Sequence, residues 1–495
     1  MKRSSWSREI GAVLVVGALL FTISCAVPLA PEYQIVKQTF DVQFVPGSAP
    51  ELHIHNAYTL QNSGTAPLDF IDVVFPDAKT YGRINLQVEL GGRPVTPQNL
   101  PEEYQVGSPG ALRLPFASPW TQKEKRDLVI DYTFAPAAGA TTQAAESFQL
   151  GTRGWLPVFL PPNHILADTP GQPPTMTFSV RVPTSFVVIA RGSEAGRKQD
   201  GTENIYHFNL GQDDLAPYVV AGRYLSSPEA KKSSGAVFWT TQPLPAGVSA
   251  TQQRFTTAWG VLQKDFGKIN KRETYPYFVE SPAISFAATD SSPGDFASFP
   301  GGVFIDQAAL APGANNSAFI SESERALART WFGDALYPAR TALIAVGEGL
   351  PGYAAIVIDE ASDGPSARQE DVVRSLHVYD EAHGRLQAPE KPVVATLPTD
   401  SSEQRSIAYA KAPLLFIALE DSCGGASVRQ GVADSIQLLR GKEVSINDLR
   451  AAIEYRCGKT LAGPFRAWLY NPGIPPAFRT RYAQAEENKK EAAAN

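Results

Sequence analysis

The sequence predicts a multidomain α+β protein in which an antiparallel β sandwich or saddle precedes a mostly helical region. The length of 495 residues exceeds what one ordinary core needs. A hydrophobic content of 43% suffices for packed cores and argues against a disordered chain. The apolar periodicity changes from strand-like to helix-like near residue 230. We therefore expect an N-terminal β domain over 34–225 and a second domain over 230–480.

The first 25 residues carry a targeting signal. Three basic residues precede an apolar run over 10–24, which is short for a membrane span, and Cys25 follows directly. The sequence TISC resembles the cleavage box of bacterial lipoproteins, with Thr22 where Leu is usual. We expect a signal peptide over 1–25 and lipidation of Cys25. An ordinary secreted protein is the alternative.

Strands are predicted where short alternating runs lie between Gly, Pro and Asn, as in 85–91, 175–182 and 218–225. Few segments before residue 226 are long enough for a helix. An all-β first domain follows.

Helices are predicted after residue 230. The run 250–267 places four large apolar side chains on one helical face, and the runs 412–424, 428–441 and 445–458 each end at Gly. In the last of them, Ser445 is the expected N-cap and Gly458 the expected residue after the C-cap. The segment 388–406 is expected to be a connecting loop, and 484–495 a disordered tail.

The charge and the cysteine content of the chain limit which partners and which cell compartments we expect. The net charge is −6 and no long basic run occurs, so we expect no nucleic-acid partner. Besides Cys25, the chain has only Cys423 and Cys457, which could form a disulfide in an oxidising compartment. Two buried free thiols are the alternative.

The run ESERALARTWFGDALYP over 322–338 has the spacing of a zinc-peptidase helix without its metal ligands. In H-E-x-x-H, two His at i and i+4 hold the metal and the Glu polarises water. Here Arg325 and Arg329 have that spacing, and Ala326 stands at the Glu position. Eighteen residues separate Arg329 from Glu348, which lies between two glycines.

These motifs resemble the aminopeptidase-N family of gluzincin zinc metallopeptidases. In that family W-F-G follows the second His, as in 331–333, and the third zinc ligand is a Glu in N-E-G after 18 residues, as at Glu348. The run 409–419 resembles the family's Y-x-K-G segment, and 461–478 its F-x-x-W-L-x-x-x-G-x-P sequence. The resemblance implies a thermolysin-like α/β domain with a helical C-terminal half over 230–480.

The resemblance also assigns roles, several of which this chain cannot fulfil. Tyr409 falls on the Tyr that stabilises the oxyanion. Alternatively, the ring of Tyr409 packs in the core. We expect Pro413 in the first turn of the helix that follows. Phe299 lies about where the Glu of G-A-M-E-N grips the substrate's amino group, in a stretch that is either a peptide-binding β edge or a Gly-Pro turn. The positions of the first His, the general-base Glu and the second His are occupied by Arg325, Ala326 and Arg329.

Other histidines offer no replacement ligands. His53 and His55 share a face of a predicted strand without an evident third ligand, and His377 and His383 are poorly spaced for joint ligation. We therefore expect no cofactor, and zinc only if this interpretation of the helix is wrong.

Physical chemistry suggests what fills the vacated site. A partly buried carboxylate at Glu348 without a metal needs a cation or hydrogen-bond donors nearby. We predict that Arg325 and Arg329 supply them. In the alternative, both Arg lie on a solvated helix face and pair with Glu322 or Glu324, and Glu348 is a structural carboxylate.

The sequence therefore predicts an exported, non-catalytic aminopeptidase-like protein. It would be tethered by lipid to a bacterial membrane, or be periplasmic or secreted, and would bind a peptide or protein partner in the former substrate cleft. One alternative is an active metallo-aminopeptidase or another hydrolase, although neither Ser321 nor Ser323 has an assignable His or Asp partner. Another alternative is a structural envelope protein.

Overall fold

The computed structural model describes most of the chain between residues 33 and 482. The predicted signal peptide with Cys25, and the predicted tail over 484–495, lie outside the described residues. The described residues are 33–75, 83–100, 111–135, 147–150, 155–160, 176–210, 217–227, 235–244, 248–269, 276–280, 284–285, 298–299, 302–305, 317–333, 335–397, 400–440 and 442–482.

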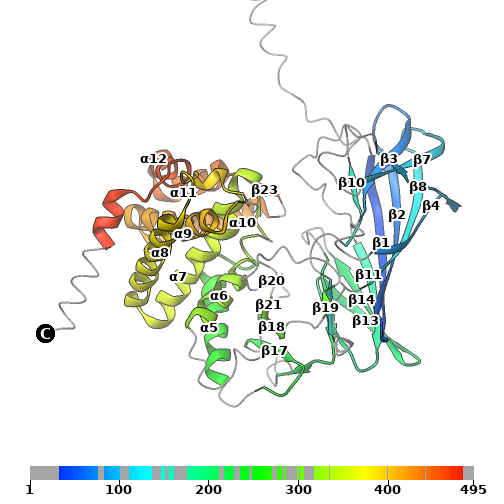
Figure 1. Cartoon of the computed structure of the whole chain (residues 1–495), viewed down its shortest axis with the longest axis horizontal. Coiled ribbons are helices and arrows are strands. Elements are labelled where there is room, and N and C mark those ends of the chain that lie inside the picture. Colours follow the sequence, from blue (N-terminus) through cyan, green and yellow to red (C-terminus); the bar gives the residue numbers. More distant parts are fainter. Residues whose placement is uncertain are drawn as a thin grey trace, which may run out of the picture.

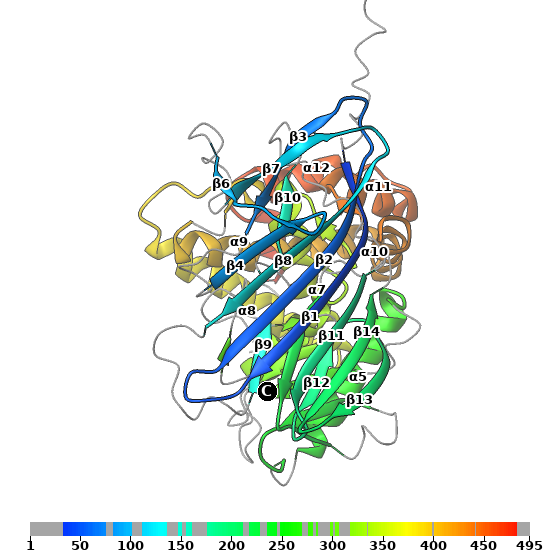
Figure 2. The same cartoon turned by 90° about the vertical axis from the view of Figure 1, so that its right-hand side faces the viewer.

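An eight-stranded sheet dominates the N-terminal half and forms one side of the molecule, with the helices behind it (Figure 2). Its order is β13-β14-β11-β1-β2-β8-β4-β5, and only the β1–β11 pair is parallel. Side chains alternate, so that Phe40, Val42 and Phe44 are buried while Asp41 is exposed on the opposite face. The strands are β1 (Tyr33–Val45), β2 (Glu51–Asn62), β4 (Arg83–Leu90), β5 (Arg93–Pro94), β8 (Lys125–Phe134), β11 (Met176–Pro183), β13 (Ser193–Asp200) and β14 (Glu203–Leu210).

Two four-stranded sheets pack against the buried face of the large sheet. In the sheet β10-β3-β7-β6, Trp120 lies 5.9 Å from the ring of Tyr33. In the sheet β12-β15-β9-β19, Phe148 stacks at 4.8 Å on Phe44. The layered β domain predicted from the alternating runs is therefore present. The strands are β3 (Leu68–Val74), β6 (Gln98–Asn99), β7 (Ala111–Trp120), β9 (Ser147–Leu150), β10 (Val158–Leu160), β12 (Val187–Ala190), β15 (Val219–Gly222) and β19 (Ile284–Ser285).

A mixed five-stranded sheet, β16-β17-β18-β21-β20, begins the second half (Figure 1). Strands β17, β18 and β21 are parallel neighbours, and β20 pairs antiparallel with β21 at the edge. Phe255 of helix α5 stacks at 4.2 Å on Phe278 of β18, so this helix covers the sheet. The strands are β16 (Leu225–Ser226), β17 (Val237–Thr240), β18 (Tyr277–Glu280), β20 (Ser298–Phe299) and β21 (Gly302–Ile305); β22 (Tyr337–Pro338) and β23 (Glu443–Val444) form a separate pair.

Helices make up the rest of the second half and lie on the side opposite the large sheet (Figure 1). None of the described helices has the length and the apolar run that a membrane span requires. The helices are α5 (Ser249–Asp265), α6 (Ser317–Ala328), α7 (Leu350–Asp363), α8 (Pro365–Arg385), α9 (Ser402–Cys423), α10 (Gly425–Leu439), α11 (Ile446–Cys457) and α12 (Ala462–Phe465), with short turns η3 (Arg340–Ala342), η4 (Ala345–Gly349), η5 (Val393–Ala395) and η6 (Arg466–Tyr470).

Local sequence signals placed two helices correctly. Helix α5 buries Phe255, Trp259 and Leu262 on one face, as the periodicity predicted. Helix α11 begins after Ser445, whose side chain accepts from the main-chain N–H of residue 448, and ends at Gly458 with φ of 66°. Both caps were expected from the sequence.

The start of α9 corrects two expectations. Residues 402–406 are helical rather than part of a connecting loop, because Ser401 caps the helix by accepting from the N–H of Gln404 at 3.2 Å. Pro413 therefore lies in the helix interior and not in its first turn. The helix continues through it because Ile407 and Leu414, on either side of the proline, are buried in the core.

Candidate functional site

Helix α6 is held in register by the aromatic pair that follows it. Trp331 and Phe332 are fully buried. The indole of Trp331 donates to the carbonyl of Gly267 at 2.8 Å and meets the ring of Trp259 edge-on at 4.8 Å. These contacts fix α6 against α5, and they fix the direction in which Arg325 points.

Glu348 lies in the π-helical turn η4 that leads into α7. A turn of this kind inserts a residue into a helix and often marks functional sites. The next residue, Gly349, approaches α9 closely, since a Cβ there would lie 2.9 Å from the Cβ of Ala412. A Cβ at Gly352 would lie 2.5 Å from Pro413 Cγ. The glycine after Glu348 thus permits α7 and α9 to pack together, and this packing sets the position of the carboxylate.

Arg325, Arg329 and Glu348 meet at one carboxylate oxygen. The Nη2 atom of Arg329 lies 2.9 Å from Glu348 Oε2, and the Nη2 atom of Arg325 lies 3.1 Å from it. The three side chains are 18%, 18% and 17% exposed. Charge-assisted hydrogen bonds of this kind are stronger than neutral ones. The structure thus brings together residues that the sequence separates by about twenty positions.

The structure does not show the alternative in which the arginines pair with a nearby Glu of α6. Glu324 is fully buried and binds Arg254 of α5, whose Nε lies 2.6 Å from Glu324 Oε1. Arg325, on α6, and Arg329, in the turn directly after α6, instead bind Glu348 of η4.

Tyr409 borders the same site. It lies within α9, half-buried, and the guanidinium carbon of Arg325 is 5.8 Å from the centre of its ring. That distance is within the range of a cation–π interaction. Tyr409 therefore lies beside Arg325 at the border of the site.

The donor set does not fit zinc. A guanidinium group carries only hydrogen-bond donors and offers a metal ion no lone pair. Ala326, at the general-base position, is fully buried and supplies only a methyl group. Within the described ranges, no three His, Cys, Asp or Glu side chains are arranged to hold a metal ion.

The remaining predicted residues make no contact with this site that the structure describes. His53 and His55 are on the exposed face of β2, where His55 Nδ1 is 2.6 Å from Asp131 Oδ1. Ser323 is fully buried, and none of the described residues hydrogen-bonds to its hydroxyl or could act as its activating base. Phe299 belongs to the edge strand β20, and its side chain lies outside what the structure describes.

A buried carboxylate cluster lies behind α6 and was not predicted. Arg254 pairs with Glu324 and with Asp359 and Asp363 of α7, so one guanidinium serves three carboxylates. Burial raises the pKa of Glu324 to about 8, although Arg254 opposes the shift. Burial and the nearby Asp359 raise the pKa of Asp371, on α8, to about 7. The cluster thus holds protons near neutral pH.

The sequence contains only a weak signal for this cluster. Asp359 and Asp363 have the i, i+4 spacing of one helix face, but Arg254 precedes them by more than a hundred residues. Single-sequence patterns cannot pair residues over that separation.

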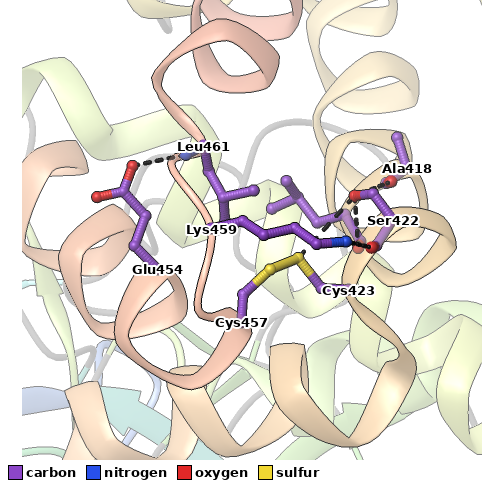
Figure 3. Close-up of a disulfide and its surroundings, with 8 residues drawn as sticks. Ala418, Ser422, Cys423, Glu454, Cys457, Lys459 and Leu461 are labelled. Atoms are coloured by element: carbon purple, nitrogen blue, oxygen red, sulfur yellow. Dashed lines mark hydrogen bonds between the residues drawn. A yellow bond between two sulfur atoms is a disulfide. The ribbon is translucent and has the colours of Figure 1, made fainter.

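A disulfide joins the C-terminal ends of α9 and α11 (Figure 3). Cys423 and Cys457 have Cα atoms 5.3 Å apart. The ammonium group of Lys459 donates to the carbonyl of Ser422 at 2.7 Å beside the bridge. The bridge therefore restrains the helix that carries Tyr409.

Comparison with known proteins assigns the fold. No protein-family model and no curated protein sequence matches the chain. The crystal structure of an M1 zinc metallopeptidase from Deinococcus radiodurans matches 90% of this chain and 96% of its own, with a TM-score of 0.60 and 17% identity. Yeast LTA4 hydrolase in complex with bestatin matches 93% of this chain and 72% of its own, with a TM-score of 0.62 and 15% identity. The β-rich N-terminal region and the helical half that follows it therefore have the fold of the M1 zinc metallopeptidases, as the motifs predicted.

Proposed function

We propose that this chain is a non-catalytic, exported relative of the aminopeptidases, which binds a peptide or protein partner in the region of the former metal site. The observation that carries the proposal is the contact of Arg325 and Arg329 with one oxygen of Glu348. It replaces the metal with guanidinium groups. The general-base position has no acid, because Ala326 occupies it.

The edge strand supports binding of an extended peptide. Strand β20 ends the five-stranded sheet, and among the described strands only β21 pairs with it. Extended peptides add to sheet edges of this kind through main-chain hydrogen bonds. Helix α6, which carries Arg325 and ends one residue before Arg329, packs on β21. A peptide along β20 would thus lie close to the arginines.

Export is supported by the apolar run before Cys25 and by the disulfide, which persists in oxidising compartments. We further propose that Cys25 carries a lipid and tethers the chain to a bacterial membrane.

Metal analysis and a substrate screen on the same preparation test the absence of catalysis. We expect no stoichiometric zinc, no rise in melting temperature on adding zinc, and no hydrolysis of a broad set of aminoacyl substrates, with an active M1 zinc metallopeptidase as the positive control. A bound metal would stabilise the folded chain by mass action. One zinc per chain with a matching rise in melting temperature would contradict the proposal, as would hydrolysis that a metal chelator abolishes.

A further inference from the structure

Arg325 has hydrogen-bond donors that the protein does not use. Its Nη2 donates to the carboxylate of Glu348 at 3.1 Å and contacts the carbonyl of the same residue at 3.5 Å. Its Nε is buried without an acceptor, and no residue in the described part of the chain accepts from Nη1. A donor without a partner is unfavourable, so an acceptor that reaches Nη1, which is not among the fully buried donors, would gain a hydrogen bond at little cost in protein contacts.

The counter-ion of Arg325 is shared. Glu348 presents one oxygen to Arg325 and to Arg329, and its carboxylate supplies a single negative charge to both. The side chain of Arg325 remains 18% exposed, and its Nε is fully buried, so a ligand from solvent would approach the Nη atoms. The ring of Tyr409 beside it forms a flat wall. A planar anion is the group that fits a guanidinium fork next to such a wall.

We propose that Arg325 is the specificity residue of the binding site and recognises a carboxylate of the bound peptide, either its C-terminal carboxylate or an acidic side chain. This inference rests on the proposed function, because it names the chemical group that the partner presents. A free amino terminus is disfavoured at this position, since its ammonium group would lie beside the guanidinium of Arg325.

Four sets of synthetic pentapeptides, otherwise free of charged residues, test the inference by titration calorimetry with the full chain. The first set has an acetylated N-terminus and a free C-terminal carboxylate, and the second has both ends blocked. The third has a free amino terminus and an amidated C-terminus, and the fourth has both ends blocked with one central Glu. We expect the first or the fourth set to bind about 10- to 100-fold more tightly than the second and third, as one charged hydrogen-bonding group provides.

Variants then assign the effect to the guanidinium. Arg325→Met is expected to abolish the preference for the carboxylate, and Arg325→Lys to retain only part of it, because Lys lacks the planar fork. Arg385→Met is the matched control, since Arg385 is 61% exposed and pairs with Glu381 on α8. If Arg325→Met lowers the melting temperature too far for titration, Arg325→Lys alone decides.

The outcomes separate this inference from the proposed function. Equal binding of all four sets, tightest binding of the third set, or a carboxylate preference that survives in both Arg325 variants would overturn the inference and leave a peptide-binding protein. Failure of every set to bind at millimolar concentration would overturn the proposed function together with it.

Discussion

Arg329 Nη2 lies 2.9 Å from Glu348 Oε2, at the spacing along the chain that separates two zinc ligands in the peptidases which this sequence resembles. In this chain the cationic partners of the carboxylate are guanidinium groups. Because its neighbours are now hydrogen-bond donors, the site can hold its geometry without a metal.

Removal of the shared carboxylate should destabilise the chain. We expect Glu348→Ala to lower the free energy of unfolding by about 1–3 kcal/mol, the range for hydrogen bonds to charged groups, because the site is only partly buried. Urea unfolding measures the change. Glu381→Ala, which breaks an exposed pair on α8, is the control and should cost less than about 1 kcal/mol. Equal effects of the two substitutions would show that Glu348 is an ordinary surface carboxylate.

Restoring the motif should restore metal affinity. The triple substitution Arg325→His, Ala326→Glu and Arg329→His rebuilds H-E-x-x-H with Glu348 in place as third ligand. We expect one zinc per chain by metal analysis but little aminopeptidase activity, because the family resemblance puts Phe299 about where the amino-binding Glu would lie.

The same triple substitution combined with Glu348→Gln provides the control for that experiment. Zinc retention should fall when the third ligand is removed. Unchanged zinc content would mean that the metal binds elsewhere, and the position assigned to Glu348 would then be wrong.

Stability should depend on the protonation of Glu324. Its pKa is raised from 4.5 to about 8 by burial, so the folded chain binds this proton more tightly than the unfolded chain does. The proton stabilises the folded chain fully below about pH 4.5, and this contribution is lost as the pH rises towards 8, by about 1.4 kcal/mol for each unit of pKa shift.

Denaturant midpoints between pH 6 and pH 9 measure this dependence. Glu324→Gln should flatten the decline, since the amide does not titrate. Glu322→Gln, on the same helix but partly exposed, should leave it unchanged. Parallel pH curves for Glu324→Gln and the unmodified chain would assign the decline to other groups.

The disulfide should contribute measurably to stability. Reduction, or Cys423→Ser with Cys457→Ser, is expected to lower the free energy of unfolding by about 3–4 kcal/mol for a closed loop of this length. Free-thiol labelling of the denatured, unreduced protein provides the direct check. Labelling at both positions would show that the bridge does not form in the expressed protein.

Lipidation should decide where the chain partitions. Expressed in a bacterium, the chain should fractionate with membranes, and Cys25→Ser should release it, because the anchor would be the acyl chains on that residue. Cys423→Ser serves as a control for loss of a cysteine elsewhere. A membrane fraction that is unchanged by Cys25→Ser would refute the lipid anchor.

Sequence spacing predicted the contact of Arg325 and Arg329 with Glu348, because both sides of this contact lie in short segments. The pair Trp331 and Phe332 fixes the face of α6, and the interval to Glu348 fixes where η4 meets it. The cap at Ser401 was overlooked although Gln404 follows it at the spacing of a capping box. The preference of proline for the first turn of a helix led to a predicted start near Pro413. The structure has this proline inside α9, where the burial of the residues on both sides outweighs that preference.

The carboxylate cluster could not be predicted, for a different reason. Its members come from α5, α6, α7 and α8, and only tertiary packing brings Arg254 to Glu324. The residues of this group have no periodicity of their own. In the sequence they look like ordinary solvated positions on helices.

Strand β19 also imposes an order on synthesis. It pairs in parallel with β9, Ile284 opposite Phe148, and so completes a sheet whose other strands all lie before residue 223. As the polypeptide leaves the ribosome, the outer edge of β9 stays uncovered until Ile284 has emerged, and an uncovered edge invites pairing with other chains. We therefore expect a first half expressed without residue 284 to leave this edge of β9 unpaired and to associate with other chains more readily than the full chain does.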